Sequence, residues 1–227
     1  MSAGPRIAII GCGNMGAALA MGLAGLKNMN VTLIGFDTDA EKMTALAAET
    51  GLTPAASPLE AAQNADIILL CVKPKLVTGV AATIAPALNR DKVMVSIAAG
   101  VRAGDIRAAI GHASPVVRTM PTTTLLVQEG LFAVVFDDPA LKEAQKQLLY
   151  SLLTALGKVY EFPSENEISA FTAVAGSGPG FMFQLWSGYV EGAVALGFSR
   201  AEAVDMVLSV ALGSAKLALQ SGRSLAG

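Results

Sequence analysis

The sequence predicts an α/β fold in which a doubly wound parallel sheet is followed by an all-helical C-terminal domain. Short apolar runs alternate with longer helical segments up to about residue 162, which is typical of a parallel sheet with crossover helices. The strand pattern stops at Pro163, and the later segments have the spacing of helices. We therefore expect two domains, residues 1–162 and residues 163–227.

The predicted strands are short and apolar, as strands buried on both faces of a parallel sheet are. They are Arg6–Ile10, Val31–Phe36, Asp66–Val72, Val93–Ile97, Pro115–Arg118, Leu131–Phe136 and Lys158–Phe162. The clearest helices between them are Ala17–Leu26, Asp39–Glu49 and Leu141–Leu156. This alternation places the carboxyl ends of the strands along one edge of the sheet, where such folds bind ligands.

Helix boundaries after Pro163 are marked by capping residues. Ser164 with Glu167, and again Ser199 with Glu202, have the spacing of a capping box at a helix N-terminus. Gly197 is expected to end the helix that precedes Ser199.

The composition excludes several classes of protein and favours a homo-oligomer. Charged residues make up 15 % of the chain and hydrophobic residues 53 %, so one copy has few charges with which to cover its surface. The net charge is −2 without a basic block, which argues against a nucleic-acid partner or an anionic membrane surface. Cys12, Cys71 and the single His112 have no disulfide or metal-binding spacing, which favours reduced thiols in the cytoplasm.

Two uncharged stretches, Ile7–Leu26 and Ile168–Val190, have the length of a targeting or membrane segment. Each contains several glycines, which interrupt a continuous apolar helix. We therefore expect buried elements rather than a membrane span.

The first chemical motif is a glycine-rich turn between the first predicted strand and the helix that follows it. Gly11 permits the tight turn, Gly13 allows the backbone to approach a pyrophosphate, and Gly16 allows the helix to pack on the strand. The helix N-terminus then offers free N–H groups to the anion. A structural turn without a ligand is the alternative. We predict a Rossmann-type dinucleotide-binding domain whose turn binds the cofactor through Gly11, Cys12, Gly13, Asn14, Met15 and Gly16.

Asp37 lies 21 residues after Gly16, at the end of the second predicted strand. An acidic side chain at this position accepts hydrogen bonds from the ribose hydroxyls of the cofactor and repels a 2′-phosphate. Thr38 and Asp39 supply no compensating cation, although Lys42 is close enough along the chain to do so. The alternative role, capping the following helix, suits Asp39 better. The sequence therefore slightly favours NADH over NADPH.

Two further strand ends are candidates for cofactor contacts. In Val72-Lys73-Pro74, the lysine could hold a ribose hydroxyl or a substrate carboxylate, or remain a solvated loop residue. In Ile97-Ala98-Ala99, the small side chains would allow a nicotinamide to lie close to the backbone, or they pack a helix. We predict that both segments bind the cofactor.

Two motifs further along the chain add to this pattern. Val116–Pro121 has the sequence VVRTMP, and Gly176–Gly180 has the sequence GSGPG. Together with GCGNMG, VKP and SIAAGV, in this order, they resemble the pyrroline-5-carboxylate reductases across essentially the whole chain. The resemblance implies hydride transfer from NAD(P)H to the C=N bond of 1-pyrroline-5-carboxylate, which gives L-proline. It also implies a homodimer formed through the C-terminal helices, with dimers that assemble into decamers in some members.

The resemblance implies roles for individual residues. The glycine-rich turn and the two strand ends would bind the cofactor. The residues implied at the substrate are Met120, Pro121, Thr122, Ser177, Gly178 and Pro179. Independently, Pro179 suits the first turn of a helix capped by Ser177 or Gly178, whose free N–H groups attract a carboxylate. A plain helix kink is the alternative.

The chain departs from the family pattern at several positions. Thr122 and Thr124 stand where the family usually has Asn and Pro, and Ala175 stands where it has Ser. Asp37-Thr38 replaces the usual Asn-Arg pair. The sequence also stops before the family's Gly-Gly-Thr-Thr segment, which holds the substrate carboxylate. We therefore expect residues 1–227 by themselves to bind a dinucleotide but to turn over 1-pyrroline-5-carboxylate poorly.

No general acid is assigned from the sequence. A cation at Lys73 would disfavour protonation of the ring nitrogen, and His112 is expected to be a solvated loop residue. Two alternatives stay open, a related imine or keto-acid reductase and a non-catalytic protein that senses NAD(P). A β-hydroxyacid dehydrogenase or a ketopantoate reductase would need a catalytic lysine or glutamate motif on a helix. The helix at Glu165–Val174 contains no lysine, which argues against both.

Overall fold

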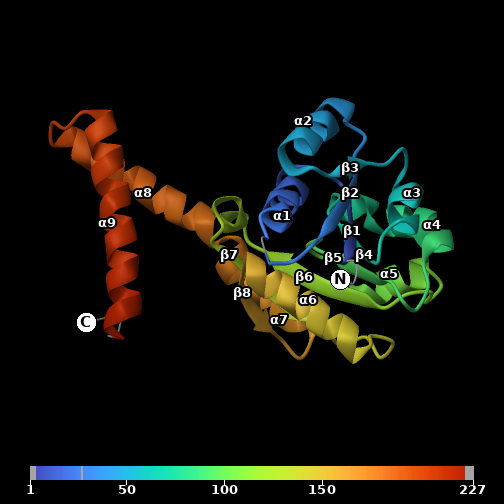
Figure 1. Cartoon of the computed structure of the whole chain (residues 1–227). Coiled ribbons are helices and arrows are strands. Elements are labelled where there is room, and N and C mark those ends of the chain that lie inside the picture. The colour runs from blue at the N-terminus through green and yellow to red at the C-terminus, as the bar shows by residue number, and fades with distance from the viewer. Residues whose placement is uncertain (1–3, 27, 223–227) are drawn as a thin grey trace. The chain divides into compact units, whose positions relative to one another are not determined.

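A computed structural model describes residues 4–26 and 28–222. Its largest feature is an eight-stranded sheet with the order β3-β2-β1-β4-β5-β6-β7-β8 (Figure 1). The strands are β1 (Arg6–Ile10), β2 (Thr32–Phe36), β3 (Thr53–Pro54), β4 (Ile67–Leu70), β5 (Val93–Ser96), β6 (Val116–Pro121), β7 (Gly130–Val135) and β8 (Gly157–Glu161). The strand order reverses at β1, between β2 and β4, as the predicted doubly wound arrangement requires.

Helices cover both faces of this sheet. They are α1 (Asn14–Ala24), α2 (Ala40–Thr50), α3 (Pro58–Gln63), α4 (Val77–Ile84), α5 (Ala103–Ala109), α6 (Glu143–Leu156) and α7 (Glu165–Phe171). Because side chains alternate along a strand, Ile7 and Ile9 of β1 pack with α1, α2 and α6. Ala8 and Ile10 pack with α3, α4 and α5 on the other face. The central strands are therefore buried on both sides, which explains their apolar sequences.

The sheet is parallel as predicted, except at one strand pair. β7 runs antiparallel to β6, with Arg118 opposite Val135 and Pro121 opposite Phe132. The connection contains the 3₁₀ helix η3 (Thr123–Val127) and no α-helix, so the chain returns directly beside β6. β8 pairs in parallel with β7 because α6 supplies a crossover. The two-residue strand β3 was also not predicted.

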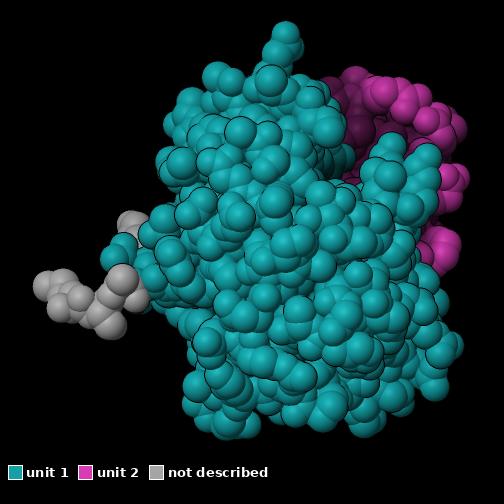
Figure 2. Space-filling model, turned by 90° about the vertical axis from the view of Figure 1, so that its right-hand side faces the viewer, with its two compact units in different colours: residues 1–176 teal, residues 177–227 magenta. Residues whose placement is uncertain are grey.

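The chain forms two compact units, Met1–Gly176 and Ser177–Gly227 (Figure 2). The sheet ends at Glu161, beside the domain boundary predicted from the sequence. α7 and the π-helix η4 (Thr172–Gly176) still belong to the first unit. Ile168 of α7 is buried against Ala133 and Val135 of β7, which fastens this helix to the sheet.

The second unit consists of α8 (Gly178–Ala195) and α9 (Arg200–Ser221). Ser199 and Glu202 form the predicted capping box, because each side chain accepts a hydrogen bond from the backbone N–H of the other. Gly197, with φ of +103°, follows the end of α8 as predicted. At α7 the arrangement differs, since the Ser164 hydroxyl donates to the Glu167 carboxylate at 2.5 Å.

Little of the second unit is buried within the unit itself. Val190 of α8 packs against Ala203 and Val207 of α9. Most of the large apolar side chains on both helices remain exposed, including Phe183, which is 63 % exposed. Among the helices that the structure describes, none has the length and apolar character needed to cross a membrane.

Candidate dinucleotide and substrate site

The glycine-rich turn has the conformation that its sequence predicts. Gly11 has φ of +96°, which favours glycine, and its N–H donates to the Phe36 carbonyl at 2.8 Å. A Cβ on Gly16 would lie 2.0 Å from the Gly11 carbonyl oxygen, so α1 approaches the turn too closely for any side chain there. A Cβ on Gly13 would meet no atom of the described residues within 4 Å. Gly13 therefore borders open space, where a phosphate group fits.

α1 begins immediately after this turn, with Gly13 as its N-cap and without a capping side chain among the described residues. The first N–H groups of the helix are therefore left for an outside partner. A helix start of this kind attracts anions through these donors and through the helix dipole. The residues present thus fit the pyrophosphate of a dinucleotide.

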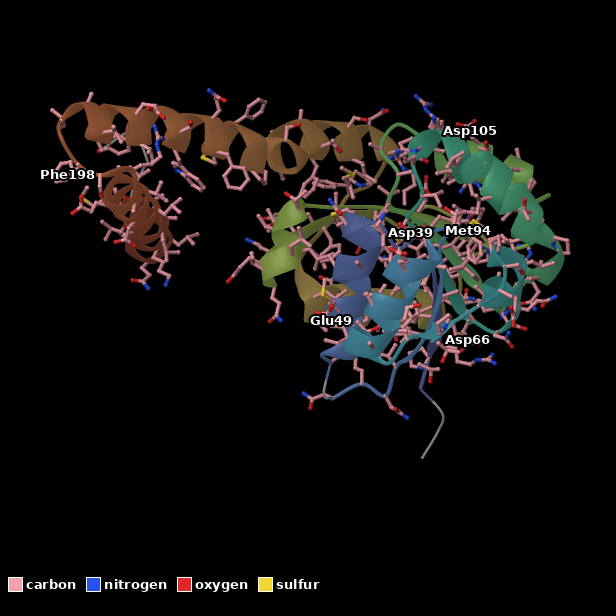
Figure 3. All side chains as sticks on the ribbon, turned by 90° about the horizontal axis from the view of Figure 1, so that it is seen from above. Asp39, Glu49, Asp66, Met94, Asp105 and Phe198 are labelled. Atoms are coloured by element: carbon pink, nitrogen blue, oxygen red, sulfur yellow. The ribbon has the colours of Figure 1, made fainter. Side chains whose placement is uncertain are left out.

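Asp37, which follows β2, is held against the glycine-rich turn. Its Oδ2 accepts a hydrogen bond from the Cys12 N–H at 2.7 Å, and its Oδ1 accepts one from the Asp39 N–H at 3.0 Å. Asp39 is the N-cap of α2, accepting from the Lys42 N–H at 3.1 Å, as the sequence predicts (Figure 3). Asp37 is therefore free of the capping role and stays at the cofactor end of β2.

A cleft of about 610 Å³ lies at the carboxyl ends of β1, β2 and β4. It is large enough for a substantial part of a dinucleotide. Five of the residues predicted to bind the cofactor line it, and they are Gly11, Gly13, Asp37, Val72 and Lys73. The structure therefore brings the first three cofactor segments together in one depression.

The two cysteines beside this cleft are uncharged thiols. Burial and, to a smaller extent, the nearby Asp37 carboxylate together raise the pKa of the Cys12 thiol to about 11. Burial also raises the pKa of Cys71. As neutral thiols, the two cysteines add no negative charge to the turn.

Lys42 and Lys75 also line the cleft, in addition to Lys73. Lys42 forms an ion pair with Asp39 at 2.9 Å. The cation that the sequence places nearest to Asp37 thus has a carboxylate partner of its own.

The segment after β5 supplies the fourth strand end. Ala98 is buried, and its N–H donates to the Ser96 hydroxyl at 3.3 Å. Its carbonyl accepts a hydrogen bond from the guanidinium of Arg118 at 3.2 Å. The Ile97-Ala98-Ala99 segment is therefore held by side-chain contacts rather than by packing alone.

The residues predicted to contact the substrate differ in accessibility. Met120 is partly exposed at the end of β6, beside the Gly176 end of η4. Thr122 is buried, and its hydroxyl accepts from the Leu131 N–H at 3.0 Å and bonds to the Thr124 hydroxyl at 2.6 Å. This hydroxyl holds the turn between β6 and β7, which accounts for the two threonines without a substrate contact.

Ser177, Gly178 and Pro179 form the start of α8 in the second unit. Ser177 is the N-cap, and Pro179 lies in the first turn, as predicted. Among the described residues, the Ser177 side chain makes no capping hydrogen bond. The Gly180 and Phe181 N–H groups donate to the Ser177 carbonyl, and Pro179 has no N–H. Within the described part of the chain, the donors left at this helix start are therefore the Gly178 N–H and the Ser177 hydroxyl, which is not used for capping.

His112 lies away from these segments. It occupies a left-handed turn with φ of +56° before β6, in a groove that also contains Arg90, Arg107 and Asp138. This groove is at the amino ends of β5 and β6, whereas the cofactor segments follow the carboxyl ends of their strands. The predicted solvated loop position agrees with its exposure.

Two family models match the chain. Residues 6–100 match "NADP oxidoreductase coenzyme F420-dependent", and residues 165–226 match "Pyrroline-5-carboxylate reductase dimerisation". Pyrroline-5-carboxylate reductase of Pseudomonas aeruginosa is 37 % identical over 217 residues, which cover 96 % of this chain and 79 % of that protein. The Escherichia coli K12 protein of the same name is 34 % identical over 221 residues, which cover 96 % of this chain and 80 % of that protein. The chain belongs to the pyrroline-5-carboxylate reductase family.

Solved structures agree with this assignment. A pyrroline-5-carboxylate reductase from Coxiella burnetii superposes with a TM-score of 0.86 at 27 % identity, covering 98 % of this chain and 82 % of that one. The Plasmodium falciparum pyrroline carboxylate reductase with NADP bound has a TM-score of 0.82 at 26 % identity, covering 96 % and 80 %. A Streptomyces aurantiacus imine reductase, at 17 % identity and a TM-score of 0.64, shares the fold.

Membership of the pyrroline-5-carboxylate reductase family makes the chain an NAD(P)-dependent oxidoreductase with a Rossmann-type N-terminal domain. The match to the dimerisation model indicates a homo-oligomer.

One pair of residues near the site was not singled out from the sequence. Arg118 of β6 and Glu165 of α7 form a salt bridge at 2.7 Å, and the Arg118 side chain is only 5 % exposed. An arginine between apolar neighbours in a predicted buried strand is a signal that could have revealed it, because arginine is rarely buried without a partner. Its partner could not be found in this way, since Glu165 lies 47 residues away in the sequence.

Proposed function

We propose that this chain is a pyrroline-5-carboxylate reductase, which transfers hydride from NAD(P)H to the C=N bond of 1-pyrroline-5-carboxylate and forms L-proline. The observation that carries the cofactor half of the proposal is the start of α1, whose N–H groups lack a capping side chain among the described residues and border the cleft beside Gly13. The substrate half rests on the relatives, which carry this name over 96 % of the chain.

The bound cofactor would supply the hydride. The backbone of the glycine-rich turn, from Gly11 to Gly16, would hold its pyrophosphate. Lys73, which lines the cleft after β4, would bind a ribose hydroxyl or the substrate carboxylate. A protonated imine accepts hydride more readily, and a cation beside the ring nitrogen would disfavour that proton. We therefore assign Lys73 a binding role and attribute most of the acceleration to the positioning of the two reactants.

We infer a preference for NADH. Asp37 is fixed by the N–H groups of Cys12 and Asp39, so its carboxylate cannot easily move away from a 2′-phosphate. Lys42 is paired with Asp39, which reduces the positive charge available to such a phosphate. Both observations support ribose hydroxyls as the partners of Asp37.

We propose that Met120 and Pro121 contact the substrate. As a separate proposal, Ser177, Gly178 and Pro179 bind a carboxylate at the start of α8 through the Gly178 N–H and the Ser177 hydroxyl, while Pro179, which has no N–H, fixes the first helical turn. Support comes from the partial exposure of Met120 and from the Ser177 N-cap, whose side chain makes no capping bond among the described residues. Thr122 takes a weaker part in this proposal, because its hydroxyl already has two partners.

We further propose that the oligomer forms through α8 and α9, as a dimer that can assemble into a decamer. The support is the large apolar surface that these helices expose, compared with the few residues buried between them. We expect the protein to work in the cytoplasm, in keeping with its two free cysteines.

The activity is tested with the purified full chain, 1-pyrroline-5-carboxylate and either NADH or NADPH, following loss of absorbance of the reduced cofactor and formation of proline. Complementation of a proline auxotroph tests it in cells. Proline formation would support the proposal. Poor turnover by residues 1–227 that is restored by appending the family's Gly-Gly-Thr-Thr segment would support it as well. Binding of a dinucleotide without turnover of any cyclic imine or keto acid, even with that segment appended, would instead identify an NAD(P)-sensing protein, and turnover of another imine or keto acid would identify a related reductase.

A further inference from the structure

Arg118 and Glu165 connect three segments of the first unit that are distant in sequence. One terminal nitrogen of Arg118, Nη1, donates to Glu165 Oε2 at 2.7 Å, and the other, Nη2, donates to the Ala98 carbonyl at 3.2 Å. The second carboxylate oxygen, Glu165 Oε1, accepts a hydrogen bond from the Ala103 N–H at 3.0 Å. The pair therefore contacts both ends of the segment between β5 and α5.

This segment would otherwise have little to define its path. It reverses direction at Gly100, where φ is +75°, and leads into the N-terminus of α5. Arg102, the N-cap of α5, makes no side-chain capping bond among the described residues. Glu165 takes over that role from another helix, because it accepts from the Ala103 N–H in the first turn.

The pair is not explained by stability alone. Burying an ion pair costs desolvation free energy that its attraction often fails to recover, and well-packed apolar residues are frequently as stabilising. The Arg118 Nε atom is also buried and has no hydrogen-bond partner among the described residues. What the pair supplies instead is geometry, because the guanidinium presents its donors in a rigid plane.

We propose that Arg118 and Glu165 are positioning residues that hold the Ile97-Ala98-Ala99 segment in place for the nicotinamide half of the cofactor. This rests on the proposed function, which assigns that segment to the cofactor. Neither side chain touches the adenosine end of the cleft, which is formed by Asp37 and the segments after β1, β2 and β4. Loosening the pair therefore weakens the binding of the nicotinamide portion and leaves the binding of the adenosine portion unchanged.

The test compares two ligands by calorimetry on the full chain. NADH carries the nicotinamide, and ADP-ribose lacks it. Arg118→Lys, which keeps the charge but loses the planar fork, and Glu165→Gln should each weaken NADH binding and lower kcat, by about 10- to 100-fold. Binding of ADP-ribose should stay within about twofold, which is within the error of such comparisons.

Arg107→Lys is the matched control. Arg107 forms a salt bridge with the buried Asp138 at 3.2 Å, beside the amino end of β6 and away from the cofactor segments. This variant should bind both ligands as the unchanged protein does. A double variant, Arg118→Met with Glu165→Leu, removes both charges together, so it keeps the fold even where a single variant leaves one charge unpaired. It should show the same selective loss of NADH binding.

Equal weakening of NADH and ADP-ribose, or no change in NADH binding and kcat for the double variant, would overturn the positioning role. The proposed function fails differently, when the chain binds NADH but does not reduce 1-pyrroline-5-carboxylate even with the family's Gly-Gly-Thr-Thr segment appended. In that case the ligand comparison still tests the pair, because it measures binding and not turnover.

Discussion

At the scale of a single residue, Asp37 both holds the glycine-rich turn in place and bears on the choice between NADH and NADPH. Its carboxylate accepts from the Cys12 N–H of the glycine-rich turn and from the Asp39 N–H before α2. It therefore joins the ends of β1 and β2 at the place where the adenosine ribose of a dinucleotide would lie. A fixed negative charge at this position disfavours a 2′-phosphate.

Replacing Asp37 by Ser should shift the protein from NADH towards NADPH. The variant removes one negative charge but keeps a short side chain that can accept a hydrogen bond. The ratio of kcat/KM for NADPH to kcat/KM for NADH should therefore rise by about tenfold or more, and tenfold is equivalent to about 1.4 kcal/mol. Steady-state kinetics with both cofactors, together with direct titration, measure the ratio. Glu41→Ser, which removes a charge from the first turn of α2, is the control and should leave the ratio unchanged. Tight NADPH binding by the unchanged chain that does not respond to Asp37→Ser would refute the assignment.

At the scale of secondary-structure elements, Asp138 links β6, α5 and the segment after β7. Its carboxylate accepts hydrogen bonds from the Val116 N–H at 3.0 Å, the Ala140 N–H at 2.9 Å and the Arg107 guanidinium at 3.2 Å. Burial, the largest effect, raises the pKa of Asp138, but the two N–H donors and Arg107 together lower this pKa below its ordinary value. The ionised form is thus the one that the fold prefers.

Asp138→Asn should lower the free energy of unfolding at neutral pH by about 1–3 kcal/mol, because an amide nitrogen cannot accept one of these bonds. A carboxylate with a lowered pKa in the folded state stabilises the protein above its unfolded pKa, which is about 3.9. That contribution disappears as the pH falls through the folded pKa. The difference in the free energy of unfolding between Asp138→Asn and the unchanged protein should therefore shrink below about pH 4. Urea unfolding at several pH values measures this difference in the free energy of unfolding. Asp91→Asn, at an exposed carboxylate, is the control. A constant difference across this range would contradict the role of ionisation.

Among the secondary-structure elements, the local sequence determines where some helices begin but not the direction of every strand. Asp39 and Ser199 cap α2 and α9 as expected, because a capping bond spans only three residues. The direction of β7 was not predicted, because an apolar strand has the same alternation whether its neighbour is parallel or antiparallel. The absence of an α-helix between Pro121 and Gly130 was the signal that could have indicated the reversal.

At the scale of the whole molecule, the second unit bears large apolar side chains that its two helices do not bury. Those on α8 and α9 that are exposed include Phe181, Phe183, Leu185, Tyr189, Leu208, Leu212, Leu217 and Leu219. Surfaces of this kind commonly mark protein–protein interfaces. The match of residues 165–226 to a dimerisation model points to the same conclusion.

Phe183→Asp together with Leu212→Asp should convert the oligomer into smaller species, because two charges would be buried in the apolar interface. Light scattering on a sizing column at micromolar concentration measures the mass. Val127→Asp, at an exposed apolar residue of η3 in the first unit, is the matched control and should leave the mass unchanged. If the unchanged chain is a stable monomer, or the double variant keeps its full mass, the interface does not lie on these helices.

The sequence by itself determined the alternation of strands and helices, the glycine-rich turn and the family motifs, because each depends on residues close together in the chain. The tertiary structure decided the direction of β7, the use of Thr122 in a turn and the attachment of α7 to the sheet. It also decided that Asp37 binds the turn 25 residues before it, and that Arg118 meets Glu165 and Ala98. These contacts join residues that only the packed sheet brings together, so neither propensity nor spacing specifies them.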